Sequence, residues 1–263
     1  MRAEPVADGW VLRGTKTWST FAGRAELLAV LARTDPDPGS GHRGLSMFVV
    51  DKPRCPGREF VLDQPGGGVL RGRAIPTIGY RGMHSFELVF DGWRVAGNAL
   101  VGEEAGRDRG FYLQLLGFGT GRLQTAARAV GTMQAAYDAA ADYAATRETF
   151  GAPLITRPLM RRLLADMAVR IAVNRVFSYS VAPQMGHPRG HLEASMVKAL
   201  SCRAAESVTR DAMQVFGGYG YAEEYSVSRY FVDARVLSIF EGAEEVLALR
   251  VIAGNLVADA AGR

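Results

Sequence analysis

The spacing of apolar residues changes once along the chain, near residue 106, from a strand pattern to a helix pattern. Between residues 9 and 101, short runs rich in Val, Leu, Phe and Trp, such as "WVLRGTKTW" and "FELVFDGWRV", are separated by turn-forming stretches such as "DPDPGSGHRG". Short strands joined by such loops, with no long helical segment between them, predict an antiparallel sheet arranged as a small barrel or sandwich.

From Gly106 onward, apolar residues recur at three- and four-residue spacing, which predicts amphipathic helices. The long helical segments cover residues 111–148, 158–182 and 192–216, and a shorter one covers residues 243–257. Helices of this kind bury their apolar faces against one another in a bundle. We therefore expect an α+β fold, with an antiparallel β-domain over residues 1–103 and a C-terminal four-helix-bundle domain over residues 104–263.

The composition, with 48% hydrophobic and 22% charged residues among 263, is that of an ordinary soluble protein. No run of about 18 apolar residues predicts a transmembrane helix, and "MRAEPVADGW" lacks the pattern of a signal peptide. We therefore expect a cytoplasmic protein without membrane insertion. The net charge of +4 comes from arginines interleaved with 27 acidic residues. Because no concentrated basic patch results, we expect no nucleic-acid partner.

The residue types that bind metals or phosphates in common motifs are not arranged for either role. Cys55 and Cys202 form no CxxC pair, and His187 and His191 in "HPRGH" flank a proline and a glycine that break a helix. The glycine-rich stretches "GFGTGR" and "PGGGVLRGR" lack the patterns of dinucleotide-binding and phosphate-binding loops. We expect no metal site.

One carboxylate occupies an unusual position, in "SIFEGAEEV". Glu241 follows the bulky apolar residues Ile239 and Phe240 directly, and Gly242 comes next. Burial beside apolar groups raises the proton affinity of a carboxylate, as a general base requires. The alternative is that Glu241 and the two glutamates after it merely favour the positive N-terminus of the last helix. These nine residues leave both interpretations open.

Several motifs in order resemble the flavin-dependent acyl-CoA dehydrogenases. In the helical half these are "TRETFG", "LADMA", "QVFGGYGYAEEYSVSRYFVDARV" and "IFEGAEE"; in the strand half they are "GTKTWST", "ARTD", "GLSMFVV" and "GYRGMHSFELVFDGWRV". Family members have an N-terminal helical domain before the β-domain. The resemblance therefore implies that this chain is a fragment, or that a separate chain supplies the missing helices.

The resemblance implies FAD-dependent α,β-dehydrogenation of an acyl-CoA thioester, in which a base removes the α-proton and the β-hydrogen leaves as hydride to the flavin. Glu241 aligns with the catalytic base, and Gly242 leaves room for the thioester. Some members carry the base on the first long helix instead. In this chain that position is Gly121, which precedes Arg122 and has no side chain that could act as the base. Arg122 and Gly242 are the implied substrate-binding residues.

The resemblance assigns FAD binding to three motifs. In "TWST", Trp18 and Thr20 match residues that pack against the flavin ring and hydrogen-bond near its N5; the alternative is a core tryptophan in an amphipathic strand. In "RETFG", Arg147 and Phe150 match a pair that reaches the pyrophosphate and adenosine across a dimer interface. The alternative there is an arginine that interacts with the dipole of its own helix end.

In "QVFGGYG", Gln214, Gly217 and Gly218 match a loop that lets the partner subunit's cofactor approach the backbone; the alternative is a glycine C-cap. The family resemblance further implies a homo-oligomer, a dimer or homotetramer. It also implies an electron-transfer flavoprotein as the electron acceptor.

Five positions depart from the usual family pattern. Ala243 replaces a Thr, Val232 an Arg, Gly119 an Asp that often helps to bind CoA, and Leu247 and Ala248 a Gln-Arg pair. These changes argue against an ordinary straight-chain substrate. The form "SRYFVDARVLSIFEGAEE" is most similar to the branch that acts on methylsuccinyl-CoA, a branched dicarboxylic thioester. Two alternatives remain: a flavin-dependent acyl-CoA oxidase on the same scaffold, and a non-catalytic subunit.

Overall fold

The computed structural model describes residues 1–187 and 190–261 and divides the chain into two compact units, Met1–Leu116 and Gly117–Arg263. We call them the β unit and the helical unit and describe each by itself. The domain boundary expected between residues 103 and 104 stays a prediction. Within the described residues, no helix is both long enough and apolar enough to cross a lipid bilayer.

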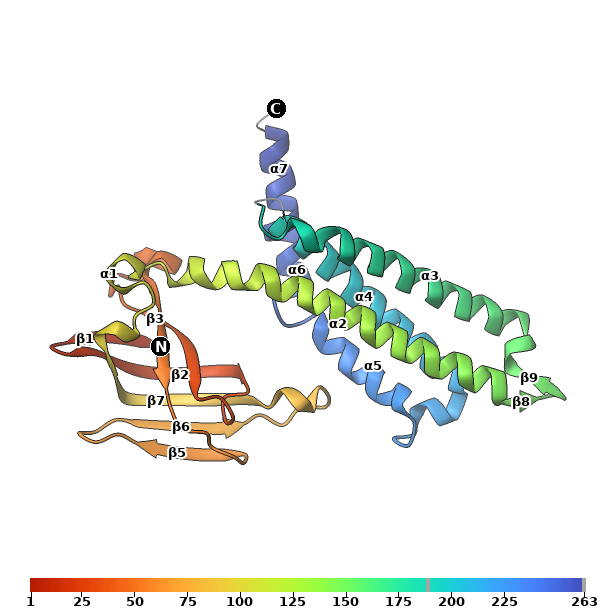
Figure 1. Cartoon of the computed structure of the whole chain (residues 1–263), viewed down its shortest axis with the longest axis horizontal. Coiled ribbons are helices and arrows are strands. Elements are labelled where there is room, and N and C mark those ends of the chain that lie inside the picture. Colours follow the sequence, from red (N-terminus) through yellow and green to blue (C-terminus); the bar gives the residue numbers. More distant parts are fainter. Residues whose placement is uncertain (188–189, 262–263) are drawn as a thin grey trace. The chain divides into compact units, whose positions relative to one another are not determined.

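The β unit is built on one seven-stranded sheet (Figure 1). Its strands are β1 (Arg2–Val6), β2 (Gly9–Thr20), β3 (Leu27–Arg33), β4 (Leu45–Asp51), β5 (Glu59–Asp63), β6 (Val69–Ala74) and β7 (Ser85–Ala96). They lie in the order β4-β3-β1-β2-β7-β6-β5, and neighbours are antiparallel apart from β1 and β3. The expected antiparallel sheet is thus confirmed.

Alternate residues of the strands form the core of this unit. In β7, Phe86, Leu88 and Phe90 are buried and the residues between them are more exposed, as the two-residue period of a strand requires. From other strands, Trp10 and Phe48 meet edge to face with ring centroids 5.5 Å apart, a favourable geometry for aromatic pairs.

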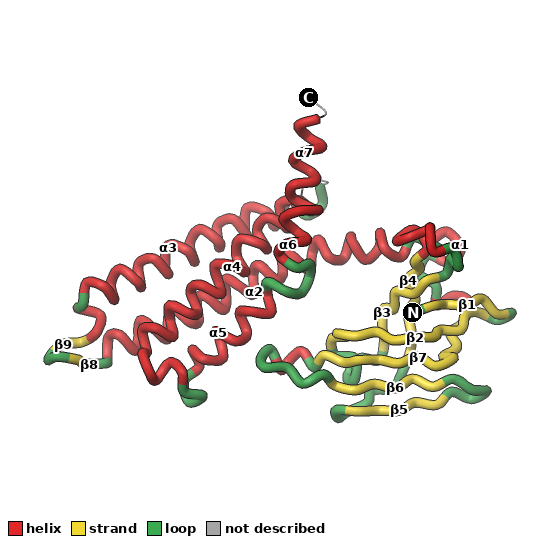
Figure 2. Tube along the Cα trace, turned by 180° about the vertical axis from the view of Figure 1, so that it is seen from behind, coloured by secondary structure: helices red, strands yellow, loops and turns green. Residues whose placement is uncertain are grey.

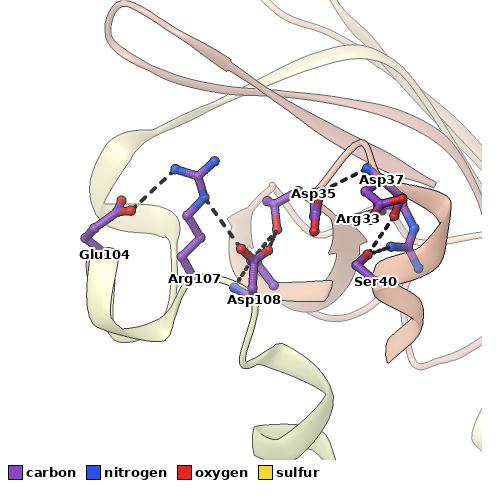
Figure 3. A network of polar contacts seen from close by, with 9 residues as sticks. Arg33, Asp35, Asp37, Ser40, Glu104, Arg107 and Asp108 are labelled. Atoms are coloured by element: carbon purple, nitrogen blue, oxygen red, sulfur yellow. Dashed lines mark hydrogen bonds and ion pairs between the residues drawn. The ribbon is translucent and has the colours of Figure 1, made fainter. Parts of the chain in front are cut away.

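A polar network ties the start of the long helix α2 (Gly110–Thr146) to β3 and β4 (Figure 3). Thr34 Oγ1 donates to Asp108 Oδ1 at 2.6 Å, and the backbone N–H of Asp108 donates to Ser46 Oγ at 2.8 Å. Gly110 lies directly against the backbone of Ser46, where a Cβ would collide. These contacts hold the segment that precedes α2 against the ends of β3 and β4.

Among the residues that the structure describes, the helical unit contains the rest of α2, followed by five further α-helices and a short hairpin. Its elements are β8 (Glu148–Thr149), β9 (Ala152–Pro153), α3 (Pro158–Val181), α4 (Gly190–Phe216), α5 (Ser226–Leu237), α6 (Glu244–Val246) and α7 (Ala253–Ala261). The short helix α1 (Glu103–Gly106), which precedes α2, belongs to the β unit. Figures 1 and 2 show the C-terminal part of α2, α3, α4 and α5 side by side. The three long helices expected from the sequence are present.

The structure differs from the predicted helices at two places. The last segment, expected as one helix over residues 243–257, consists of α6, a π-helical stretch at Leu247–Ile252, and α7. The "HPRGH" stretch was expected to be a loop; Pro188 lies outside the described residues, but Gly190 begins α4 and His191 lies within it. Gly190 fits at this helix start because it packs against the backbone of Gln184, where a Cβ would collide.

Polar side chains cross the interface between α3 and α4. Arg170 Nη1 donates to Asp211 Oδ2 at 2.8 Å and to Ser207 Oγ at 3.0 Å. Nearby, Ser201 Oγ donates to Asn174 Oδ1 at 2.9 Å. Because the Asp211 carboxylate is largely buried, these donors take the place of water as its hydrogen-bond partners.

We expect Arg170→Met to lower the free energy of unfolding by about 2 kcal/mol, because it deprives a largely buried carboxylate of a charged donor. Arg210 also contacts Asp211, at 3.2 Å, but its side chain is mostly exposed. The matched variant Arg210→Met should therefore lose less than about 1 kcal/mol. Urea unfolding of the two variants measures both effects. Equal losses would contradict the expectation.

Candidate functional site

The stretch "IFEGAEE" follows α5 and contains two consecutive residues in left-handed backbone conformations. Glu241 has a φ of +55° and Gly242 a φ of +104°. Glycine adopts positive φ readily, whereas a glutamate does so at a cost in conformational energy. Residues strained in this way are held by the contacts around them, and they are common at functional sites.

The three carboxylates of this stretch have different surroundings. Ala243 is the N-cap residue of α6, so Glu244 and Glu245 lie in the first helical turn, where negative charge is favourable. Glu244 also forms an ion pair with Arg203 of α4. Glu241 precedes the N-cap and lies on the left-handed turn. A role in stabilising the helix terminus therefore accounts for its two neighbours rather than for Glu241.

The carboxylate of Glu241 faces α2 at Gly121. A Cβ added to Gly121 would lie 2.8 Å from Glu241 Oε2. The carboxylate therefore occupies space that exists because this position has no side chain. The apolar cover expected around Glu241 is incomplete, because Ile239 is 53% exposed while Phe240 and Glu241 are half-buried.

Two buried cations donate hydrogen bonds to the backbone of this turn. Arg122 Nε, on α2, donates to the carbonyl oxygen of Glu241 at 3.3 Å, and Lys198 Nζ, on α4, donates to that of Gly242 at 2.7 Å. Arg122 is 7% exposed and Lys198 is 0% exposed. Arg122 Nη1 also donates to Ser195 Oγ at 3.2 Å. The guanidinium expected to bind substrate thus contacts protein groups, and its role toward substrate stays a prediction.

Burial disfavours the charged form of both cations. It lowers the pKa of Lys198, which Arg122 lowers further while Cys202 and Glu241 oppose the change. It also lowers the pKa of Arg122, against the attraction of Glu241. Sequence reasoning missed Lys198. Its signal is a lone lysine among small and apolar residues in "ASMVKALSC", since lysine is rarely fully buried without a partner.

Four of the residues predicted to bind FAD come together around an open pocket of about 570 Å³ in the helical unit. It lies between the C-terminal end of α2, the short hairpin and the end of α4. Arg147, Gln214, Gly217 and Gly218 line it, together with other residues that include Tyr143 and Tyr219. The structure therefore brings together residues that are about 70 positions apart in the sequence.

The lining of this pocket suits a phosphate-bearing group. Arg147 is exposed, with Cζ 6.0 Å from the centre of the Tyr219 ring. Gly217 has a φ of +59°, and a Cβ added to Gly217 or Gly218 would meet no atom within 4 Å, so their backbone borders open space. A guanidinium and accessible backbone amides are the donors that phosphates bind.

Phe150, Trp18 and Thr20 are presented outward. Phe150 is 98% exposed with a φ of +51°, next to the pocket-lining Thr149. In the β unit, a register shift between β2 and β7 falls at Lys16–Ser19, and Trp18 within it has a φ of +60° and is 63% exposed. Thr20 ends β2 and is exposed. The exposure of Trp18 argues against the core-tryptophan alternative.

Around Gly119 the imidazole of His191 occupies the space where a side chain would otherwise lie. Among the residues that the structure describes, no group of three or more His, Cys, Asp or Glu side chains is placed to hold a metal ion. Cys55 and Cys202 are both free thiols.

Two family models match the chain. The acyl-CoA dehydrogenase C-terminal domain matches residues 108–256, and the acyl-CoA dehydrogenase middle domain matches residues 1–93. Together they account for most of the chain.

Individual relatives are similar over nearly all of this chain. It is 42% identical over 261 residues to the (2S)-methylsuccinyl-CoA dehydrogenase of Cereibacter sphaeroides, covering 98% of this chain and 46% of the relative. It is 36% identical to the cyclohexane-1-carbonyl-CoA dehydrogenase of Geobacter metallireducens, covering 99% and 64%. The structure of butyryl-CoA dehydrogenase from Megasphaera elsdenii aligns with a TM-score of 0.85 at 32% identity, covering 97% and 62%. The chain thus spans less than two thirds of each relative.

We expect the thiol of Cys202 to make stability fall at alkaline pH. Burial raises its pKa from 9.0 to about 12. Between these values the folded state keeps a proton that the unfolded state has lost, so stability falls as pH rises through this window. Lys198, with its lowered pKa, acts in the opposite direction below its ordinary pKa of 10.5. Cys202→Ala should therefore show a shallower loss of stability above pH 9 than the wild type.

Urea unfolding at several pH values measures this slope. Cys55→Ala, which removes the other thiol, is the control and should keep the wild-type slope. A Cys202→Ala slope equal to that of the wild type would contradict the assignment.

Proposed function

The chain belongs to the acyl-CoA dehydrogenase family, and on this premise we propose that it carries out FAD-dependent α,β-dehydrogenation of an acyl-CoA thioester with Glu241 as the base. One observation carries the proposal. The Glu241 carboxylate faces the side-chain-free position Gly121 from a strained turn whose backbone is held by two buried cations. A strained backbone and buried charges both lower the stability of the fold. Their presence at one turn is explained if the turn must hold a catalytic base in an accurate position.

In this reaction Glu241 accepts the proton from the α-carbon of the thioester. The C–H electron pair forms the new double bond as hydride leaves the β-carbon; a bound FAD would supply the acceptor for this hydride. We assign Gly242 to the substrate side of this turn on the family resemblance; the space that its Cβ would take is occupied by Leu247, whose Cδ2 would lie 2.9 Å away. Arg122 and Lys198 keep the turn in place through its carbonyl oxygens.

The pocket in the helical unit supports the choice of FAD as the cofactor. Arg147, Gln214 and the backbone at Gly217 and Gly218 would hold its pyrophosphate and adenosine portion, and their donor chemistry fits such a group. We assign Phe150 to the same portion.

In the β unit, the exposed Trp18 and Thr20 would contact the flavin ring. In the family, the phosphate-binding residues reach the cofactor of a neighbouring subunit. The proposal therefore includes a cytoplasmic homo-oligomer, a dimer or tetramer, with an electron-transfer flavoprotein as its acceptor.

For the substrate we propose a branched or dicarboxylic acyl-CoA such as methylsuccinyl-CoA. The relative of that name shares 42% identity over 98% of this chain. Gly119 stands where many family members have an Asp that helps to bind CoA, and His191 fills the space beside it. A different side chain therefore borders this part of the helical unit, which favours a substrate other than a straight-chain one.

We expect Glu241→Gln in the flavin-loaded protein to abolish bleaching of the flavin by acyl-CoA, with a loss of at least about 100-fold in rate. The flavin should stay bound, because the substitution is isosteric and lies outside the phosphate-binding pocket. Glu245→Gln is the matched control: the same chemical change, in the same stretch, at an exposed position in the first turn of α6. It should bleach like the wild type.

A panel of methylsuccinyl-CoA, cyclohexane-1-carbonyl-CoA and butyryl-CoA, used in the same assay, identifies the substrate. Peroxide formed under air without another acceptor would favour the oxidase alternative. A wild-type protein that binds flavin but is bleached by none of the thioesters would indicate the non-catalytic subunit. Equal bleaching by Glu241→Gln and the wild type would refute the base assignment.

We expect Gly121→Ala to lower turnover by about 100-fold, because the new Cβ displaces the carboxylate that must meet the substrate. The carboxylate is the flexible end of its side chain, so stability should change little. Gly131→Ala, on the same helix with open space around its position, should gain roughly 0.5–1 kcal/mol in stability and keep full turnover. Steady-state kinetics measures the turnover of both variants, and thermal unfolding measures their stability. Full turnover in both variants would overturn the expectation.

A further inference from the structure

Lys198 is the fully buried cation of α4 that the proposed reaction does not use directly. It lies in the middle of α4 and has no exposed surface. An ammonium group without water around it is costly unless its donors are satisfied. Lys198 Nζ donates to the carbonyl oxygen of Gly242, which lies 2.7 Å away and 44 residues further along the chain.

Lys52, a buried lysine of the β unit, offers a comparison, because its hydrogen-bond partner is close in the sequence whereas that of Lys198 is distant. Lys52 Nζ also donates to a backbone carbonyl at 2.8 Å, but that carbonyl belongs to Pro53, the next residue. That bond links two adjacent residues and joins no separate helices or strands. The bond from Lys198, by contrast, joins α4 to the turn between α5 and α6, which carries Glu241.

The bonds from Arg122 and Lys198 fix two successive peptide planes. Arg122 holds the carbonyl of Glu241 and Lys198 holds the carbonyl of Gly242. When both planes are fixed, φ and ψ of Gly242, which lie between them, are fixed too. The first of these planes follows Glu241 directly, so it is also one of the two planes that orient the Glu241 side chain. Glu241 has a φ of +55°, which an L-residue abandons unless its surroundings prevent it.

We propose that Lys198 is a positioning residue, whose hydrogen bond to the Gly242 carbonyl holds the left-handed turn so that the Glu241 carboxylate stays beside Gly121. The proposal rests on the proposed function only in taking Glu241 as the base. Lys198 itself transfers no proton and contacts no substrate. Its effect on the reaction passes through the placement of Glu241.

The test uses Lys198→Met, which keeps the bulk but removes the charge and the donor, and Lys198→Arg, which keeps both. The first measurement is hydrogen exchange in the flavin-loaded protein without substrate. The amides of Phe240 and Glu244 donate to Val236 and Ser238 on either side of the turn, and they report its opening. In Lys198→Met their exchange should become faster by about tenfold or more, the effect of losing one charged hydrogen bond.

The second measurement is turnover with the acyl-CoA that bleaches the wild-type flavin. Lys198→Met should lower kcat by about 100-fold, because the base is displaced, and change KM little. Lys198→Arg should restore most of the exchange protection and of kcat. Lys52→Met is the matched control: it removes a buried lysine and its bond to a carbonyl, and should leave exchange at the turn and kcat as in the wild type.

Wild-type exchange and kcat in Lys198→Met would overturn the proposal. Faster exchange spread evenly along α4 and α5, with no rescue by Lys198→Arg, would also overturn it, because that is the behaviour of a purely structural lysine. If Lys198→Met does not fold, Lys198→Gln replaces it under the same criteria. Should the wild type lack turnover altogether, the proposed function fails, while the exchange measurement still decides whether Lys198 holds the turn.

Discussion

The candidate site depends on the hydrogen bonds that two buried cations donate to the backbone of one turn. Arg122 from α2 and Lys198 from α4 bind the carbonyl oxygens of Glu241 and Gly242. Burying an ammonium or a guanidinium is unfavourable, and hydrogen bonds to oriented carbonyl dipoles offset that cost only when the geometry is good. The packing of α2 and α4 against the turn and the conformation of the turn therefore stabilise one another.

Backbone strain is found at three of the residues to which the family resemblance assigns roles. Trp18, Phe150 and Glu241 all have positive φ values, between +51° and +60°. Each lies in a different setting: Trp18 at a register shift between paired strands, Phe150 in the two-residue turn of the β8–β9 hairpin, and Glu241 in the turn bound by the two cations. Such conformations persist only where neighbouring structure enforces them, so they are consistent with side chains that must point in a set direction.

Much of the fold was predictable because hydrophobic periodicity reports local structure. The long helices and most strands follow from it, whereas β1, β6 and α5 do not. β1 contains Pro5 and charged residues, and β6 contains Gly72, which leaves room for the ring of Phe60; proline and glycine both weaken a strand pattern. α5 is short and contains β-branched and aromatic residues, so its helical period is less evident than that of its longer neighbours.

The sequence by itself determined the change from strands to helices and the family motifs, because each is written in neighbouring residues. The motifs together, rather than the residues around Glu241, determined its choice as the candidate base. Only the tertiary structure decided what surrounds that base. Lys198 lies 44 residues from Gly242, and Arg122 lies 119 residues from Glu241. No local pattern encodes such pairings, because they exist only once helices distant in the sequence have packed together and excluded water from the charges between them.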